Sequence, residues 1–218
     1  MFPPMPPTSP LPSRRGRLRR WWPVLAALLL LVPALGFSAL RHQTARSAPL
    51  PVLGRVTDFA LVDQSNVPTE RKALDGEPWV ASFVFTRCPL VCPRLAGHMR
   101  ALQDLAQRAD TRLHLVTFTV DPEHDTPAVL GSYADAHGAD RRRWSFLTGG
   151  ESAIREVVRS FSVALEGTAD PTKANFGIMH SGHIVLVDGQ ARIRGYYPSA
   201  EEGVEQRILA DLERIGTS

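Results

Sequence analysis

The chain has 218 residues, a formal net charge of +3 at pH 7 and a sequence pI of about 9.2. Its basic excess is confined to the beginning, because seven of the 25 Lys and Arg residues and none of the 22 acidic residues precede residue 49. The remainder therefore has 18 basic against 22 acidic residues, a net of −4. We exclude a nucleic-acid surface, since no basic helix and no basic stripe interleaved with aromatic residues follows residue 49.

The beginning of the chain predicts a membrane anchor with its flanks. Residues 1–20 are rich in proline and end in five arginines, which indicates a disordered, cytoplasmic basic tail. Residues 21–40 are an uncharged stretch of 20 residues, long enough for one helix to cross about 30 Å of hydrocarbon. We therefore expect a single-pass protein of a bacterial inner membrane, with a linker over 41–50 and a periplasmic domain over 51–218. A cleaved signal peptide has a similar pattern and is the alternative, although no clear cleavage site, with two small residues separated by one other residue, follows the apolar stretch.

The sequence of the first half of the expected periplasmic domain predicts strands separated by turns. Residues 56–62 alternate enough for a strand, and residues 63–66 are typical of a turn. A second turn over 74–78 leads into residues 79–85, which form a continuous apolar run. Such a run is typical of a central parallel strand that is buried on both faces.

The second half alternates helices with strands and closes with a hairpin and a helix. Apolar residues recur at helical spacing from Leu95 to Ala106, and Thr126 with Pro127 is typical of a helix cap and first turn. The further expected elements are a strand over 113–120, a helix continuing to 137, a strand over 144–147, a helix over 151–161, a hairpin of 184–187 with 192–197, and a helix over 200–214. This order predicts an α/β domain of three layers.

Two cysteines, Cys88 and Cys92, follow the apolar run at 79–85 and precede the next helix. A pair on one tight turn can form a reactive disulfide or hold a soft metal ion, and an inert structural bridge is the simpler alternative. Closing so short a loop stabilises a fold little, because disulfide stabilisation grows with loop length. Free N–H groups in a first helical turn lower the pKa of a thiol, and Pro93 suits the first helical position. We therefore predict a redox-active or metal-binding pair on a thioredoxin-like fold.

Three motifs carry a family resemblance. They are Cys-Pro-Leu-Val-Cys-Pro at 88–93, Val-Asp-Pro-Glu-His-Asp-Thr-Pro at 120–127, and His-Ser at 180–181 ahead of Asp-Gly at 188–189. In this order and spacing they resemble the Sco/SenC family of membrane-anchored copper proteins. The resemblance covers roughly residues 52–215 and implies a thioredoxin-like three-layer sandwich with a central mixed sheet, preceded by one transmembrane helix.

The resemblance also implies copper as the bound metal, held by Cys88, Cys92 and His180. Two thiolates and an imidazole form a soft ligand set that suits Cu(I) and can hold Cu(II), whereas oxygen ligands suit hard ions. Zinc is an alternative, because it is bound by the same residue types. His183 is the alternative ligand, since it lies three residues after His180 and spacing alone does not separate the two.

Two positions depart from the family pattern. Leu90 stands where the family often has an acidic residue, so a negative charge beside the thiols is missing. Met179 precedes His180, where general thioredoxins have a cis-proline, and this disfavours a generic oxidoreductase. For Met179 itself we favour a place in the core over contact with copper.

An acidic group between the cysteines and the histidine has a structural interpretation. The residues concerned are Asp121, Glu123, His124 and Asp125. They resemble a metal cluster in composition, but aspartates commonly bond to nearby backbone donors and order turns. We therefore interpret this group as a turn beside the cysteine loop.

The resemblance implies a metallochaperone rather than an enzyme, one that delivers periplasmic copper to the binuclear copper centre of cytochrome c oxidase. The expected partners are the oxidase subunit that holds this centre, a periplasmic copper donor or thiol reductant, and the membrane. The alternative is a thiol-disulfide oxidoreductase that uses Cys88 and Cys92 to keep the oxidase's copper-ligand cysteines reduced. A redox or copper sensor is a further alternative function. A peroxidase is disfavoured, because the peroxiredoxin pattern has a threonine three residues before the cysteine, whereas Thr86 stands two residues before Cys88.

Overall fold

The computed structural model describes residues 49–166 and 182–216, which belong to one compact unit beginning at Pro49. Among the helices of these residues, none is both long and apolar enough to cross a membrane. The expected parts that lie outside the described residues are the tail 1–20, the span 21–40, most of the linker 41–50, Met179 and His180. The predicted domain boundaries therefore stay predictions.

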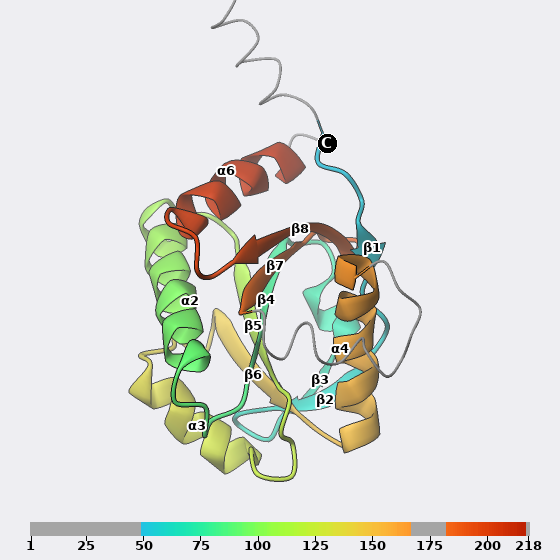
Figure 1. Ribbon diagram of the computed structural model, residues 1–218, viewed down its shortest axis with the longest axis vertical. Helices are drawn as coiled ribbons and strands as arrows, with labels where there is room; N and C mark the ends of the chain where they lie inside the picture. The colour runs from blue at the N-terminus through green and yellow to red at the C-terminus, as the bar shows by residue number, and fades with distance from the viewer. Residues whose placement is uncertain (1–48, 167–181, 217–218) are drawn as a thin grey trace, which may run out of the picture. The chain divides into compact units, whose positions relative to one another are not determined.

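Within the described residues, eight strands form one mixed sheet in the order β1-β8-β7-β4-β5-β6-β2-β3 (Figure 1). The strands are β1 (Gly54–Arg55), β2 (Ala60–Asp63), β3 (Pro68–Glu70), β4 (Trp79–Val84), β5 (His114–Thr119), β6 (Trp144–Thr148), β7 (His183–Val187) and β8 (Arg192–Pro198). β5 is parallel to both β4 and β6, and the other pairings are antiparallel. The prediction of a central mixed sheet is confirmed.

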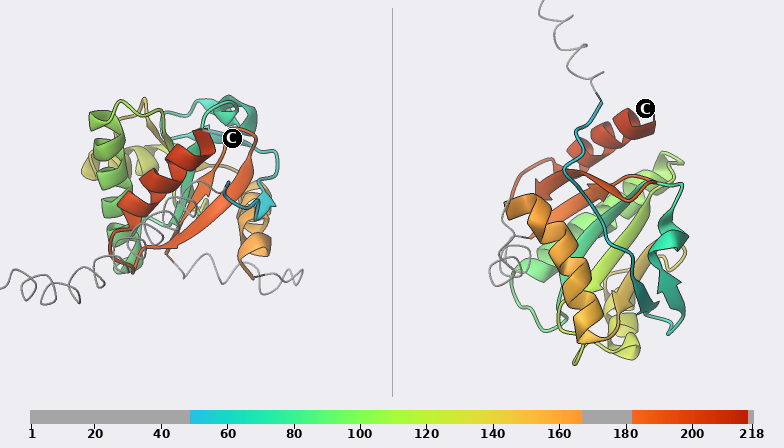
Figure 2. Two further views of the ribbon diagram at one scale, coloured as in Figure 1. Left: turned by 90° about the horizontal axis from the view of Figure 1, so that it is seen from above. Right: turned by 90° about the vertical axis from the view of Figure 1, so that its right-hand side faces the viewer.

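Helices cover both faces of this sheet and complete the three predicted layers (Figures 1 and 2). One face is covered by α2 (Val91–Arg108), α3 (Pro127–Ala136) and α6 (Val204–Gly216), whose buried residues share a core with that side of the sheet. The other face is covered by α4 (Glu151–Glu166), which packs on a second core. A short 3-10 helix, η1 (Arg71–Leu74), follows β3 and contributes to the second core.

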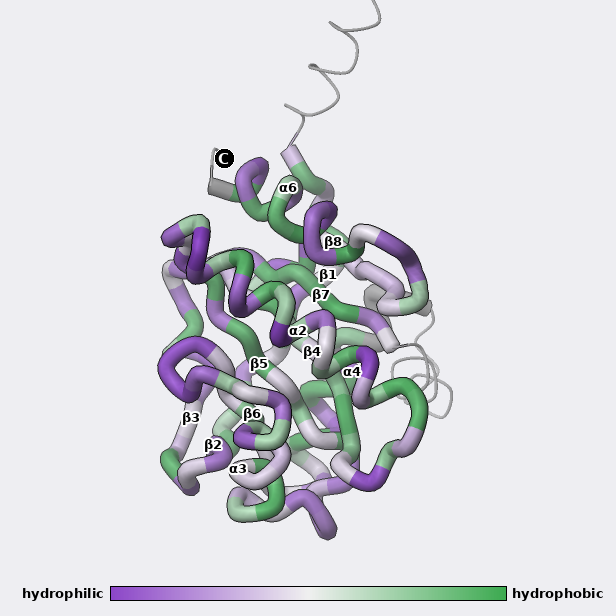
Figure 3. Tube along the Cα trace, turned by 90° about the vertical axis from the view of Figure 1, so that its left-hand side faces the viewer, coloured by the Kyte–Doolittle hydropathy of each residue, from purple (hydrophilic) through white to green (hydrophobic). Residues whose placement is uncertain are grey.

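The central strand β4 separates the two cores. All six of its residues are buried, and their side chains alternate between the faces, with Val80 and Val84 on the α2 side and Ala81 and Phe83 on the α4 side. β4 is parallel to β5 and antiparallel to β7, so the predicted central strand is parallel on one side only. Its antiparallel neighbour β7 also forms a hairpin with β8, and the apolar residues of β7 are visible as a green stretch in Figure 3.

The prediction of one strand over 56–62 is wrong in its extent. β1 ends at Arg55 and β2 begins at Ala60. The two strands lie at different places in the sheet, because β1 pairs with β8, whereas β2 pairs with β3 and β6. Val56 and Phe59 are both buried in the core on the α4 side, although they are three residues apart. Side chains three apart point to opposite faces of a regular strand, so the segment between β1 and β2 follows the second core instead.

Other expected elements form with small shifts. The Thr126 hydroxyl accepts a hydrogen bond from the Val129 N–H, which confirms the cap of α3. The hairpin turn forms as predicted, because the Asp188 carboxylate accepts hydrogen bonds from backbone N–H groups that follow it. α6 begins at Val204 rather than residue 200, since a turn with Gly203 at φ +71° precedes it. α4 continues to Glu166.

Candidate metal centre and thiol pair

The cysteine loop, residues 85–90, joins the end of β4 to the start of α2. The Cys88 N–H donates to the Phe85 carbonyl at 3.0 Å, which tightens the loop into a turn. Cys92 is the second residue of α2 and Pro93 is the third, so the prediction of Pro93 at the first helical position is wrong. The helix begins two residues earlier, and Pro93 is tolerated because the first four N–H groups of a helix have no intrahelical partner.

The two thiols differ in exposure and in acidity. Both are free, with Cys88 partly exposed and Cys92 only 5% exposed. Burial opposes ionisation of Cys88, but hydrogen bonds from the backbone of Cys92, Leu90 and Val91 and from the Cys92 thiol outweigh it and lower the pKa of Cys88. Burial raises the pKa of Cys92 to about 12, and its interactions with Cys88 and Asp125 also raise it. Cys88 is therefore the more reactive thiol, and Cys92 keeps its proton at neutral pH.

Asp125 is a fully buried carboxylate that fastens the cysteine loop. Its Oδ1 accepts from the Thr86 hydroxyl at 2.5 Å, and its Oδ2 accepts from the Thr86 N–H at 3.1 Å and the Thr119 hydroxyl at 2.6 Å. Thr86 stands two residues before Cys88, so the carboxylate holds the loop through both backbone and side chain. Its three hydrogen bonds engage Asp125 in the loop rather than presenting it to a metal ion.

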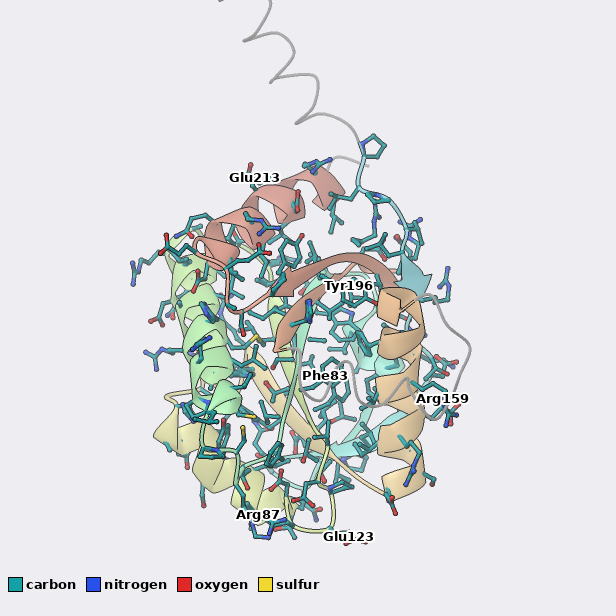
Figure 4. The ribbon with its side chains drawn as sticks, in the orientation of Figure 1. Phe83, Arg87, Glu123, Arg159, Tyr196 and Glu213 are labelled. Atoms are coloured by element: carbon teal, nitrogen blue, oxygen red, sulfur yellow. The ribbon has the colours of Figure 1, made fainter. Side chains whose placement is uncertain are left out.

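An ion pair makes a second link between the cysteine loop and the acidic turn. Arg87 Nη2 lies 2.6 Å from Asp121 Oδ2, and the Asp121 carbonyl accepts hydrogen bonds from the N–H groups of His124 and Asp125. Figure 4 shows Arg87 and Glu123 at the same end of the domain. In residues 49–166 and 182–216, no group of three His, Cys, Asp or Glu side chains is arranged to hold a metal ion. These contacts confirm the interpretation of residues 121–125 as a turn beside the cysteine loop.

The sequence did not predict how the cysteine loop is held in place, by Thr86 with Asp125 and by Arg87 with Asp121. A signal for these contacts exists in the order of the elements. The cysteine loop follows β4, the acidic turn follows β5, and the two strands are parallel neighbours. Loops after neighbouring parallel strands leave the sheet at the same edge, so polar residues at the start of each are expected to meet.

His180, the predicted third ligand, lies outside the described residues, whereas His183 is the first residue of β7. Next to it, Ile184 belongs to the core that contains Cys92, and Val185 belongs to the core on the α4 side. Strand alternation puts His183 with Val185, and its ring stands 6.4 Å from the ring of Tyr196 on that side. Burial lowers the pKa of His183. The alternative ligand is therefore on the sheet face opposite the cysteines.

Gly182 brings the chain that follows His180 to the start of α2. Its φ is +57°, and a Cβ atom at this position would lie 2.9 Å from Val91 Cγ1 and 2.7 Å from Ser199 Oγ. Val91 is the first residue of α2 and the neighbour of Cys92. A glycine is required here by both the left-handed backbone and the close approach.

Comparison with known proteins extends these observations. A model of the SCO1/SenC family matches residues 53–216. The SCO1 protein homolog of Bacillus subtilis (strain 168) is 27% identical over 169 residues, which cover 77% of this chain and 86% of the relative. Among solved structures, BsSco, a member of the Sco family of cytochrome c oxidase assembly proteins with an identified disulfide switch, gives a TM-score of 0.65 at 26% identity. The match covers 78% of this chain and 99% of BsSco.

A second structural neighbour was solved with a metal. Bradyrhizobium japonicum ScoI with copper bound gives a TM-score of 0.56 at 26% identity, covering 74% of this chain and 99% of ScoI. The range matched by the family differs by one residue at each end from the range of the predicted resemblance. The predicted resemblance is therefore confirmed, and the three-layer α/β fold is the fold of these neighbours.

Proposed function

Because the chain belongs to the SCO1/SenC family, we propose that it binds one copper ion through Cys88, Cys92 and His180 and delivers it to the binuclear copper centre of cytochrome c oxidase. The ion is cargo in this scheme, a substrate rather than a resident cofactor. A role in oxidase assembly is supported by the similarity to BsSco, and copper as the ion is supported by the similarity to ScoI.

The observation that carries the proposal is a pair of free thiols, Cys88 in the loop just before α2 and Cys92 in the first turn of that helix. Two sulfur donors so close together suit Cu(I), which prefers soft ligands and low coordination numbers. The carboxylate of Asp125, which interacts with Cys92, is already hydrogen-bonded to three donors of the protein. The donor set of the described residues therefore favours a soft ion over a hard one.

His180 is supported as the third ligand by the path of the chain. Gly182 lies against Val91, and two residues of chain extend at most about 7 Å. An imidazole carried that short distance from the start of α2 is within reach of the thiols. His183, by contrast, stands on the other face of the sheet with Tyr196.

Loading of the ion is coupled to loss of protons, because both sulfurs must be thiolates to bind it. Cys88 has a lowered pKa and ionises first. Cys92, with its pKa raised to about 12, gives up its proton only as the ion binds. The backbone N–H groups at the start of α2 then stabilise the negative sulfur of Cys88. Binding is therefore expected to strengthen as pH rises.

We also propose that the domain is held at the inner membrane by residues 21–40 and faces the periplasm. The support is the uncharged stretch itself and the five arginines that precede it. Such an anchor confines the search for the oxidase to the plane of the membrane.

A second candidate function is thiol-disulfide exchange with a partner. The asymmetry of the pair favours it, since a partly exposed thiol of lowered pKa can attack a disulfide and a buried neighbour can resolve the mixed disulfide. The same residues serve both functions, and only copper binding depends on His180.

The test is an anaerobic copper titration of the reduced, purified full-length protein with its His180→Ala and His183→Ala variants. We expect one copper per chain. His180→Ala should weaken Cu(II) binding by at least tenfold and Cu(I) binding by less, because two thiolates already meet most of the coordination requirement of Cu(I). His183→Ala, the matched control, should leave both affinities within twofold of the unmodified protein.

The opposite result from the two histidine variants would show that the third ligand is wrongly assigned. If neither variant changes copper binding, while reduction of a partner disulfide still requires Cys88, the exchange function replaces the delivery function.

A further inference from the structure

An open pocket of about 520 Å³ lies beside the C-terminal end of α2, at the start of β5. Residues just before β6 complete its wall. Its polar lining residues are Glu77, Gln107, Arg112, His114, Arg142 and Arg143. Pockets that bind small organic molecules commonly have volumes of about 300–1,000 Å³. This pocket therefore has the size of a ligand site, and neither cysteine lines it.

The register of the sheet places this pocket at the end of the sheet where the described chain begins. His114 starts β5 and pairs with Trp79, the first residue of β4. Trp79 in turn pairs with Val187 of β7, whose partner in β8 is also the partner of Gly54 in β1. The cysteine loop follows the other end of β4, roughly 17 Å away along a strand of six residues. The pocket is therefore separate from the thiol pair.

Two of the three arginines in the pocket form exposed ion pairs. Arg112 Nη1 lies 3.1 Å from Glu77 Oε1, and Arg142 Nη2 lies 2.9 Å from Asp140 Oδ2. The side chains of Arg112 and Arg142 are 84% and 86% exposed, so water weakens both pairs. A guanidinium has five N–H donors, and both arginines therefore keep donors for a ligand.

The third arginine, Arg143, has no acidic partner. It is half-buried, and within the described residues it forms no ion pair and donates one hydrogen bond, from Nη1 to the Thr111 carbonyl at 3.2 Å. Burial lowers the pKa of the neighbouring His114, while the charge of Glu77 opposes this shift and that of Arg143 adds to it. The guanidiniums of the pocket outnumber the carboxylates that pair with them, so an anion would balance the excess charge.

A phosphate group is the anion that these donors fit. Guanidinium groups bind phosphate oxygens through two parallel hydrogen bonds, and the basic side chains that line this pocket are arginines rather than lysines. A water molecule takes about 30 Å³, so the pocket has room for an organic group beside the phosphate. An organic phosphate therefore fits better than the inorganic ion.

The place of the pocket favours a membrane lipid as the source of this phosphate. Residues 41–48, which follow the expected span, extend at most about 28 Å. The beginning of the domain at Pro49 therefore stays within that distance of the bilayer, and the pocket shares the same end of the sheet. The choice of a lipid rests on the membrane anchor of the proposed function.

We propose that Arg112, Arg142 and Arg143 form a binding site for the phosphate headgroup of an anionic membrane lipid. Headgroup binding holds the tethered end of the domain at the bilayer surface. The cysteine site, at the other end of β4, is then turned away from the bilayer and is open to a protein partner.

The test titrates copper-free, full-length protein in dodecyl maltoside micelles with dihexanoyl phosphatidylglycerol, dihexanoyl phosphatidylcholine or inorganic phosphate. NMR of the His114 ring reports binding, because an anion beside the imidazole stabilises its charged form and raises the pKa of His114. We expect phosphatidylglycerol to raise this pKa. It should bind at least fivefold more tightly than phosphatidylcholine or inorganic phosphate.

Variants of Arg143 test the site itself. Arg143→Gln should weaken phosphatidylglycerol binding about fivefold, the effect of one basic side chain near an anionic headgroup. Arg143→Lys keeps the charge without the planar donor group and should recover only part of this loss. Arg112→Gln, at an exposed position, should give a similar loss if Arg143→Gln fails to fold. Arg155→Gln, on α4 at the other face of the sheet, is the matched control and should bind within twofold of the unmodified protein.

Three results would overturn the inference. Equal or tighter binding of inorganic phosphate would assign the pocket to a soluble anion instead of a lipid. Absence of binding by all three probes, or equal losses in Arg143→Gln and Arg155→Gln, would remove the site. The titration contains neither copper nor a bilayer, so its failure leaves copper delivery and the anchor standing, and a failed copper titration leaves the lipid site standing.

Discussion

Each thiol of the site takes its chemistry from its immediate surroundings. Cys88 lies ahead of α2, where backbone N–H groups converge on its sulfur, and Cys92 lies inside the first turn under apolar side chains. The residue types alone predict that a thiol near a helix start is acidic. They do not predict which of the two it is, because that depends on a helix start at Val91 instead of at Pro93.

The asymmetry predicts selective alkylation of the reduced, copper-free protein. Iodoacetamide reacts with thiolates, and the thiolate fraction of each cysteine rises with pH through its pKa. The rate at Cys88 should therefore reach half its maximum below pH 9.0, the ordinary value, and Cys92 should stay unmodified up to about pH 10. Peptide mass spectrometry over a pH series measures both rates. Faster labelling of Cys92 than of Cys88 would contradict the assigned roles.

At the scale of elements, the site is built where segments far apart in the chain meet at one edge of the sheet. The cysteine loop follows β4, the acidic turn follows β5, and Gly182 precedes β7. The long apolar strands and helices could be predicted from periodicity, since their burial is a local pattern. The path of residues 56–59 could not, because Val56 and Phe59 are placed by a core that distant segments complete.

The close approach of Gly182 to α2 predicts that Gly182→Ala weakens copper binding without removing a ligand. A Cβ atom would meet Val91 Cγ1 at 2.9 Å, and alanine is strained at φ +57°. We expect about a tenfold loss of copper affinity and a loss of more than about 1 kcal/mol in the free energy of unfolding. Copper titration and denaturant unfolding measure the two effects.

Gly97→Ala is the control for this variant. Gly97 lies within α2, and a Cβ atom there would meet nothing within 4 Å. Alanine should stabilise the helix by about 0.5–1 kcal/mol and leave copper affinity unchanged. If Gly182→Ala binds copper as tightly as Gly97→Ala, the segment before β7 does not carry the third ligand to the thiols.

At the scale of the whole domain, the cysteine site and the start of the described chain lie at opposite ends. The coloured chain begins at the upper end of the domain in Figure 1, and Arg87 is labelled at the lower end in Figure 4. The buried Arg194 fixes the start of the domain, because it donates to the Leu50 carbonyl at 2.6 Å and the Pro51 carbonyl at 3.2 Å. Its charge is balanced by Asp188 at 2.7 Å. The cysteine site therefore lies at the end of the domain opposite the residues with which the described chain begins.

The site and the start of the described chain lie at opposite ends of the domain, and five arginines precede the uncharged stretch 21–40. We therefore predict that the linker tethers the domain and takes no part in binding copper. Removal of residues 1–48, with export by an unrelated signal peptide, should release the domain from membranes and leave its copper affinity within twofold of the full-length protein. Copper content of the oxidase in cells should fall, because delivery loses its confinement to the membrane plane. Fractionation, copper titration and metal analysis of the purified oxidase measure these effects. A membrane-bound mature protein that begins beyond residue 40 would contradict the anchor, since the span 21–40 would then be a removed signal peptide.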